Sequence, residues 1–181
     1  MLALSINNST QEIEELEIEM KANTVYTFFN SILIDEIQTL ANHLIFTDAN
    51  ALSESKPACF LGEQLILGDA LIIGQNGLEE VDAYIPKAEL QELINYDIPK
   101  FYQDTLALLS KSDVNLYRTF EVIQSSEKLS LNLEWVLYTF NIADDRTKEY
   151  FLTELQKVLD TKESVEKYIK KMAQLAINAG G

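Results

Sequence analysis

The chain has 181 residues, of which 47% are hydrophobic and 24% charged, so it can bury a domain core and lacks the composition of a disordered segment or a fibre. Its formal net charge of −15 argues against nucleic-acid binding, which needs a basic surface to displace counterions. The charge is uneven, because residues 144–181 carry seven acidic and seven basic side chains and residues 1–143 therefore carry the whole excess.

The compartment is indicated by cysteine content and by the apolar runs. Cys59 is the only cysteine, so no intramolecular disulfide can form. No run approaches the roughly 18 apolar residues of a membrane span. The first ten residues also lack the positive and apolar regions of a secretion signal. We therefore expect a cytoplasmic protein with no membrane association.

The first element in chain order is predicted from residues 9–21, STQEIEELEIEMK. Ser9 and Glu12 have the spacing of a capping box at a helix start. The apolar side chains then fall on one helical face: Ile13, Leu16 and Met20. We expect residues 1–22 to form an acidic helical arm and residues 23–181 to form a single α+β domain.

Residues 24–46 predict a long helix with a wide apolar face. Its apolar residues follow the helical repeat: Val25, Phe28, Phe29, Ile32, Leu33, Ile37, Leu40 and Leu44. His43, the only histidine, would lie on this helix. The face is expected to pack on the core, and the alternative is an exposed groove for a partner.

A loop over residues 47–57 leads into residues 58–86, which hold four of the six glycines. Two apolar runs flank Gly68-Asp69, a two-residue hairpin signal. We interpret the glycines as corners in a meander of two or three short strands. A phosphate-binding loop is the alternative, but the GxxxxGK[ST] pattern is absent.

Residues 87–111 predict a helix that Pro99 either kinks or divides in two. The last helical region begins at Asp144-Asp145. Asp160 and Glu163 have capping-box spacing, so this region is expected to break near residue 160.

Between these helices, residues 114–137 predict a β-hairpin with its turn at Ser126-Glu127. That turn would set three facing pairs: Val122 with Leu131, Phe120 with Leu133, and Arg118 with Trp135. The last pair would place the guanidinium over the indole ring, a cation–π contact of about 1 kcal/mol.

These elements predict a two-layer α+β fold in which a small antiparallel sheet, a β-meander plus a β-hairpin, packs against helices. After the acidic arm the predicted order of elements is α-βββ-α-ββ-α. We expect these elements to form one domain, and the sequence shows no internal repeat that would indicate a repeat architecture.

No motif indicates an enzyme, and we expect no cofactor and no metal. A Cys59/His43 nucleophile pair is conceivable, against the alternative of a buried thiol and a hydrogen-bonded imidazole. Acidic side chains cluster at Glu79, Glu80 and Asp82, and again at Asp144-Asp145, but without a calcium-loop pattern.

The order of elements resembles the type III secretion chaperone-like fold, which includes YbjN-type proteins. The similarity covers about residues 24–178 and lies in TVYTFFNSILIDEIQTL, in FLGEQLILGDALIIG, and in the block from VNLYRTF to LQKVL. The acidic arm, Pro99 and the long last helical region depart from that pattern. The resemblance implies a non-catalytic binding protein; many members are homodimers and some wrap extended segments of a partner.

Three functions follow as hypotheses. The first is an acidic, chaperone- or adaptor-like protein that binds a basic or partly disordered protein partner. The second is an immunity or inhibitor protein that neutralises a basic toxin such as a nuclease. The third is an enzyme that uses carboxylates and a metal. The residues expected to bind the partner are Arg118, Trp135, Glu79, Glu80 and Asp82.

Overall fold

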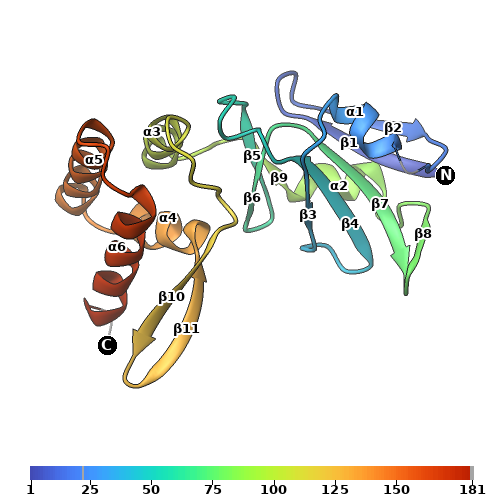
Figure 1. The fold of residues 1–181 in the computed structure, drawn as a ribbon. Helices are drawn as coiled ribbons and strands as arrows, with labels where there is room; N and C mark the ends of the chain where they lie inside the picture. Colours follow the sequence, from blue (N-terminus) through green and yellow to red (C-terminus); the bar gives the residue numbers. More distant parts are fainter. Residues whose placement is uncertain (22, 180–181) are drawn as a thin grey trace. The chain divides into compact units, whose positions relative to one another are not determined.

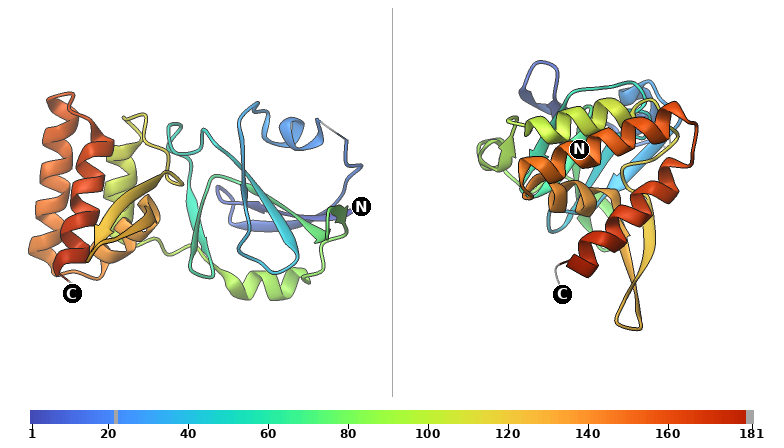
Figure 2. Two further views of the ribbon diagram at one scale, coloured as in Figure 1. Left: turned by 60° about the horizontal axis from the view of Figure 1, so that its bottom comes forward. Right: turned by 90° about the vertical axis from the view of Figure 1, so that its left-hand side faces the viewer.

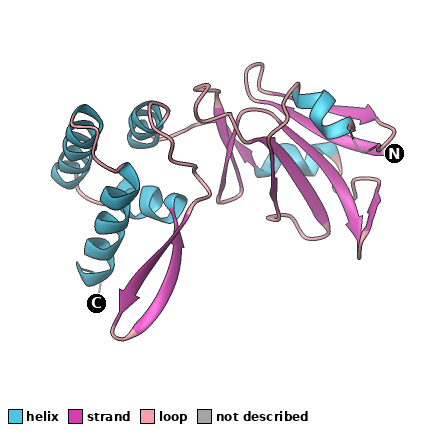
Figure 3. Cartoon of the chain, in the orientation of Figure 1, coloured by secondary structure: helices cyan, strands magenta, loops and turns pink. Residues whose placement is uncertain are grey.

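The computed structural model of the protein describes residues 1–21 and 23–179, and it has the α+β fold class expected from the sequence, with antiparallel sheets packed against helices (Figures 1 and 3). Contacts divide the chain into two compact units, the N-terminal unit (Met1–Ile98) and the C-terminal unit (Pro99–Gly181). This division falls after Ile98, whereas the sequence analysis placed its boundary after residue 22. No helix within the described residues combines the length and the apolar run that crossing a bilayer requires.

The N-terminal unit is built on an antiparallel sheet with β7 (Ala70–Asn76) at its centre. Residues 70–74 of β7 are all buried, as expected for a central strand covered on both faces. Its neighbours are β1 (Leu2–Asn7) and β8 (Glu79–Val81) on one side and β4 (His43–Asp48) on the other. The outer strands are β2 (Glu12–Glu17) and β3 (Ile34–Ile37).

Both faces of this sheet are covered. On one face, Val25 of the short helix α1 (Thr24–Phe29) packs with Leu44, Leu71 and Ile73. The opposite face buries the alternate residues of the same strands: Leu4, Ile6, Ile45 and Ile72. Figure 2 shows α1 and α2 (Lys87–Leu93) on opposite sides of the sheet. Covering both faces removes most of the apolar surface of the strands from water.

A second, smaller sheet is formed by β5 (Ala58–Leu61), with β6 (Gln64–Leu67) on one side and β9 (Ile94–Asn95) on the other. Gly62 turns β5 into β6 and Gly77 turns β7 into β8, both with positive φ, so these two glycines are corners as interpreted. Gly74 is not a corner, because it lies within β7. The predicted hairpin at Gly68-Asp69 is wrong. Gly68 passes the chain from β6 in the small sheet to β7 in the large one, and these two strands do not pair.

The predicted helix over residues 9–21 is wrong, because this segment contains strand β2. Ile13 lies opposite Ile6, and Leu16 lies opposite Ala3, so the two residues point to opposite faces of the sheet. A strand with apolar residues on both faces does not show the alternation of apolar and polar residues that identifies a half-buried strand. In β2 the apolar residues happen to be three apart, which is also the spacing of an apolar helical face.

The long helix predicted over residues 24–46 is also wrong, for the same physical reason. Asn30 takes a left-handed conformation with φ of 49° and ends α1 after six residues. The chain then forms β3 and β4, where the adjacent residues Leu44 and Ile45 are both buried on opposite faces. His43 consequently lies on a strand and not on a helix.

The C-terminal unit comprises helices around an aromatic core and one hairpin. Its elements are α3 (Lys100–Leu109), β10 (Thr119–Gln124), β11 (Glu127–Asn132), α4 (Leu133–Asn141), α5 (Asp145–Asp160) and α6 (Val165–Ala179). The fully buried ring of Phe151 contacts the rings of Phe101, Phe140 and Tyr168. The Tyr168 hydroxyl donates to the Phe151 carbonyl at 2.9 Å, so this polar group is satisfied in the core.

Proline and capping signals locate the helices well in this unit. Pro99 precedes the first residue of α3, so it starts a second helix, one of the two outcomes expected. The predicted break near residue 160 is confirmed, since α5 ends at Asp160. Ser164 rather than Asp160 caps the next helix, because its Oγ accepts from the Lys167 N–H at 3.2 Å.

The hairpin exists, but its predicted register is wrong. The turn centres on Ser125-Ser126, both with positive φ, and this places Val122 opposite Leu129 and Phe120 opposite Leu131. The strand stops at Asn132, whose side chain accepts from the Trp135 N–H at 2.9 Å and starts α4. Trp135 is therefore a helical residue and not a cross-strand partner of Arg118.

We predict that Asn132→Ala destabilises the protein by about 1 kcal/mol, because it removes this N-cap acceptor. Asn132→Asp keeps an acceptor oxygen and serves as the control, with an expected change of only a few tenths of a kcal/mol. Urea unfolding followed by circular dichroism measures both. Equal stabilities for the alanine and aspartate variants would show that the cap does not stabilise α4.

Candidate functional site

The acidic group predicted from sequence lies in the N-terminal unit. Glu79 and Glu80 are exposed on β8. Asp82 has a structural contact, since its Oδ1 accepts from the Leu2 N–H at 2.7 Å while the Ala83 N–H donates to the Leu2 carbonyl at 2.9 Å. The Asp82 carbonyl also lies so close to Gly74 that a Cβ there would collide with it. Glu79 and Glu80 are thus available to a partner, whereas Asp82 ties β8 to β1.

Arg118 and Trp135 lie in the C-terminal unit. Arg118 Nη2 is 2.8 Å from Glu166 Oε2, and both side chains are 47% exposed. An ion pair this open to water contributes little to stability. Trp135 is half-buried in the first turn of α4. The structure does not pair Arg118 with Trp135 across the hairpin, and the acidic group belongs to the other unit.

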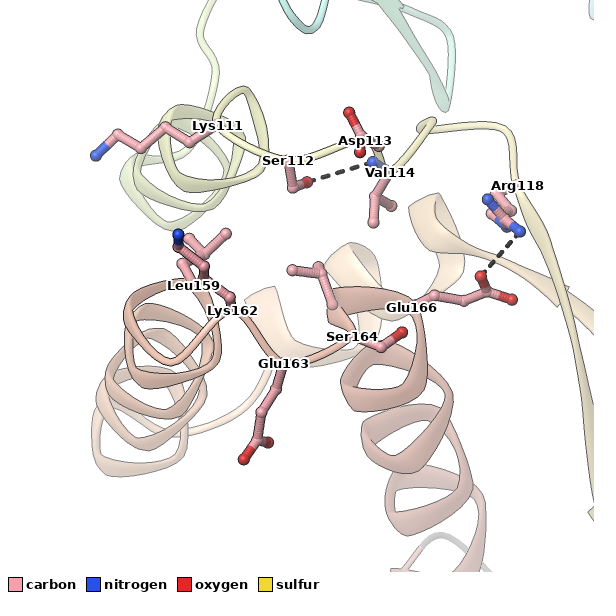
Figure 4. Close-up of a pocket in the computed structure, with 11 residues that line it drawn as sticks. Lys111, Ser112, Asp113, Val114, Arg118, Leu159, Lys162, Glu163, Ser164 and Glu166 are labelled. Atoms are coloured by element: carbon pink, nitrogen blue, oxygen red, sulfur yellow. Dashed lines mark hydrogen bonds and ion pairs between the residues drawn. The ribbon is translucent and has the colours of Figure 1, made fainter.

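Arg118 lines a pocket of about 420 Å³ between the segment after α3, the end of α5 and the start of α6 (Figure 4). Three cations and three carboxylates border it: Lys111, Arg118, Lys162, Asp113, Glu163 and Glu166. In Figure 4, Arg118 faces Glu166, while Lys111 extends away from the centre of the pocket. The charges balance, so the pocket has no net preference for a charged ligand.

The hydroxyl groups of this pocket serve the backbone. Ser112 Oγ donates to the Leu109 carbonyl at 2.8 Å and lies 3.3 Å from the Val114 N–H, and Ser164 caps α6. Neither hydroxyl is paired with a histidine, because the only histidine is in the other unit. The pocket therefore lacks a serine nucleophile with a histidine base.

His43 is a structural imidazole. Its Nδ1 lies 2.8 Å from the Ala41 carbonyl, and its Nε2 accepts from the N–H groups of Tyr84 and Ile85 at 3.0 and 3.2 Å. These partners fit an imidazole that donates from Nδ1 and accepts at Nε2. The ring holds the segment after β8 against β4, and both of its nitrogens are occupied.

Cys59 is a buried thiol and is not paired with His43. This is the alternative that the sequence offered to a Cys59/His43 nucleophile pair. Its side chain is inaccessible to solvent, and desolvation raises its pKa to about 11 despite a hydrogen bond with Asn8. A protonated and inaccessible thiol is a poor nucleophile. Within the described residues, no group of three or more His, Cys, Asp or Glu side chains comes together to hold a metal ion.

We predict that Cys59 in the native protein does not react with Ellman's reagent at about pH 8, and reacts fully once urea unfolds the chain. Ser53→Cys, which places a thiol on an exposed loop position, supplies the control that should react without denaturant. Rapid labelling of native wild-type protein would instead mean that the thiol is reachable and reactive.

Exposed apolar side chains of the N-terminal unit gather around a pocket on the α1 side of the sheet. A pocket of about 320 Å³ is lined by Met20, Lys21, Val25, Tyr26, Ile34, Phe46 and Glu80. Four exposed hydrophobic side chains occur nearby in the chain: Tyr26 and Phe28 on α1, then Ile32 and Leu33 before β3. Ile32 is 86% exposed and Leu33 53%. Exposed apolar side chains this close together in the chain make the segment a candidate interaction surface.

The segment that carries Ile32 and Leu33 is fixed at both ends. The Ser31 hydroxyl donates to Asp48 Oδ1 at 2.9 Å, and the Leu33 carbonyl accepts from the Ala49 N–H at 3.0 Å. Asp48 is itself only 5% exposed, and its Oδ2 lies 2.5 Å from Lys56 Nζ. The two apolar side chains are therefore presented to solvent by an anchored loop, which lowers the entropy cost of binding.

The hydrogen-bond partners of Asp48 stabilise its ionised form. Burial alone would raise its pKa, but hydrogen bonds from Lys56, Asn50 and Ser31 outweigh burial and hold the pKa below the ordinary value of 3.8. The same pairing raises the pKa of Lys56 in spite of its own desolvation. The ion pair is thus stabilised in its charged form at neutral pH.

A carboxyl group whose pKa is lowered by folding stabilises the protein above its unfolded pKa, and that contribution is lost as the pH falls through the folded pKa. We predict that the stability difference between wild type and Asp48→Asn is largest near neutral pH and shrinks below about pH 4. Lys56→Met removes the cation and should lessen this pH dependence. Urea unfolding across the acid range measures it, and a pH-independent difference would contradict the assignment.

The formal charge differs strongly between the two units. The N-terminal unit holds 17 acidic side chains and three lysines, a charge of −14, whereas the C-terminal unit holds 12 acidic and 11 basic side chains, a charge of −1. The exposed apolar segment thus belongs to a strongly negative unit. The sequence located the excess of charge, but Ile32 and Leu33 fitted the apolar face of a predicted helix, for which an exposed partner groove was the alternative to core packing.

Comparisons with protein-family models, with curated proteins and with solved structures found no match for this chain.

Proposed function

We propose that the chain is a non-catalytic protein-binding protein, chaperone- or adaptor-like, and that its N-terminal unit recognises a basic protein partner. The observation that carries this proposal is the concentration of −14 formal charges in the unit that also exposes Tyr26, Phe28, Ile32 and Leu33. Charge attracts and orients a basic partner, and apolar contact supplies short-range affinity.

An inhibitor of a basic toxin such as a nuclease is the second candidate. The same charge excess favours it, because a negative surface speeds encounter with a basic enzyme and competes for its substrate groove. The two candidate functions differ in the partner. An inhibitor would bind a folded basic enzyme, whereas a chaperone-like protein would bind an extended segment. A carboxylate and metal enzyme has no candidate metal-binding group within the described residues to support it.

Glu79 and Glu80 test the proposal because they are exposed and make no structural contact like that of Asp82. We predict that the tagged full chain, incubated at low salt with extract of its native cells, retains a basic protein that mass spectrometry identifies. Glu79→Lys/Glu80→Lys should weaken the complex about tenfold or more, mainly through a slower association rate.

The matched control is Glu79→Gln/Glu80→Gln, which removes half of the charge difference and keeps the side-chain shape. Its effect should be smaller, and both effects should diminish as salt screens the charges. Association rates that do not change with salt, or the recovery of an acidic partner only, would overturn the electrostatic proposal.

A further inference from the structure

Strand β3 forms the outer edge of the large sheet, beyond β4. The Ala49 N–H donates to the Leu33 carbonyl, so these two residues form a hydrogen-bonded pair in the β3–β4 ladder. Hydrogen-bonded pairs alternate in an antiparallel ladder, which makes Asp35–Thr47 and Ile37–Ile45 the next ones. The backbone N–H and C=O groups of Ile34 and Glu36 therefore point outward, away from the sheet.

Two other outer strands, β2 and β10, are protected. Four glutamates line the outer strand β2: Glu12, Glu14, Glu15 and Glu17. In the C-terminal unit, the Gln174 side chain covers the edge of β10, because its Oε1 accepts from the Ile123 N–H at 2.9 Å and its Nε2 donates to the Ile123 carbonyl at 2.6 Å. Among the residues that the structure describes, no side chain forms such a clamp on the backbone of Ile34 or Glu36 of β3. An outer strand of this kind is a template for a further strand.

The side chains beside this edge suit apolar contacts. Ile34 belongs to β3 and lines the 320 Å³ pocket together with Tyr26 and Phe46. Ile32 and Leu33 lie just before the strand and are exposed. A strand added along β3 would direct every second side chain to the face that carries the pocket, and the alternate ones to the other face.

We propose, on the basis of the proposed function, that the outer edge of β3 binds an extended partner segment in which apolar residues alternate with lysine or arginine. Main-chain hydrogen bonds to Ile34 and Glu36 hold the segment, and its apolar side chains contact the pocket beside Ile34. Its cations point to the opposite face and are attracted by the −14 charge of the unit. A second copy of the chain would instead bring like charges together along the edge, which is unfavourable.

Glu36 permits a direct test, because its N–H points outward and does not serve the β3–β4 ladder. Glu36→Pro removes that outward donor and leaves the inner ladder intact, since proline is tolerated on an outer strand at such a position. Glu36→Thr removes the same charge and keeps the backbone N–H. The two variants therefore differ in whether residue 36 has an outward N–H donor. Circular dichroism and thermal unfolding confirm that both variants are folded.

The probe is a display library of random 12-residue peptides selected on the immobilised full chain. We expect the enriched peptides to be basic and to alternate apolar with basic residues. A selected peptide should bind Glu36→Pro about tenfold more weakly than Glu36→Thr, as measured by fluorescence polarisation. Methylating alternate backbone nitrogens of that peptide should abolish binding to the unmodified chain, which keeps the test valid if the proline variant does not fold.

Each contrary outcome is informative. Equal binding of a selected peptide to both Glu36 variants and to its methylated form would overturn strand addition but leave protein binding intact. Enrichment of acidic peptides would overturn the charge complementarity. Absence of any enriched peptide would overturn recognition of an extended segment, while the pull-down from native cells independently decides whether a folded basic partner binds.

Discussion

The N-terminal unit depends on the burial of β7, whose residues 70–74 are buried and which pairs with β1, β4 and β8. A central apolar strand forces its sheet to be covered on both faces, because either face left open would expose the apolar residues of its neighbours as well. On one face the cover is α1, a helix of six residues. So short a helix leaves the outer part of the face open, and the apolar pocket beside Ile34 lies there. The candidate binding surface is thus a consequence of incomplete cover over a sheet that is buried elsewhere.

The same burial explains which parts of the fold could be predicted from the sequence. Glycine corners at Gly62 and Gly77, the helix start at Pro99 and the break after Asp160 are local signals, and they were predicted correctly. Ile13 and the partly buried Leu16 lie on opposite faces of one sheet, as do the buried pair Leu44 and Ile45, so their spacing does not reveal a strand. Ile32 and Leu33 are exposed just before β3, yet their spacing also matched the apolar face of the predicted helix. Asn30 and Ser31, a turn signal just before them, were the local indication that the helix ends.

Electrostatic and apolar features are distributed unequally between the units. The C-terminal unit is nearly neutral, its aromatic core is closed by the Tyr168 hydrogen bond, and Gln174 covers the edge of its hairpin. Arg118, expected to bind a partner, is held there by Glu166. The N-terminal unit combines a charge of −14 with an open strand edge and exposed apolar side chains. Repulsion among like charges destabilises a compact unit, so the charge excess beside these apolar side chains does not itself stabilise the fold.

Charge alone would make a poorly selective surface, because a field of −14 attracts any cationic protein and is screened at physiological salt within about 8 Å. Main-chain hydrogen bonds along β3 would add affinity but little selectivity, since every peptide carries the same backbone groups. Selectivity must then come from the side-chain sites, which are the pocket beside Ile34 and the anchored pair Ile32 and Leu33. Asp48 is central to this division of roles, because one buried carboxylate accepts the Ser31 hydroxyl and pairs with Lys56. It holds the apolar pair in place, and because it is buried it remains out of reach of the proposed basic partner.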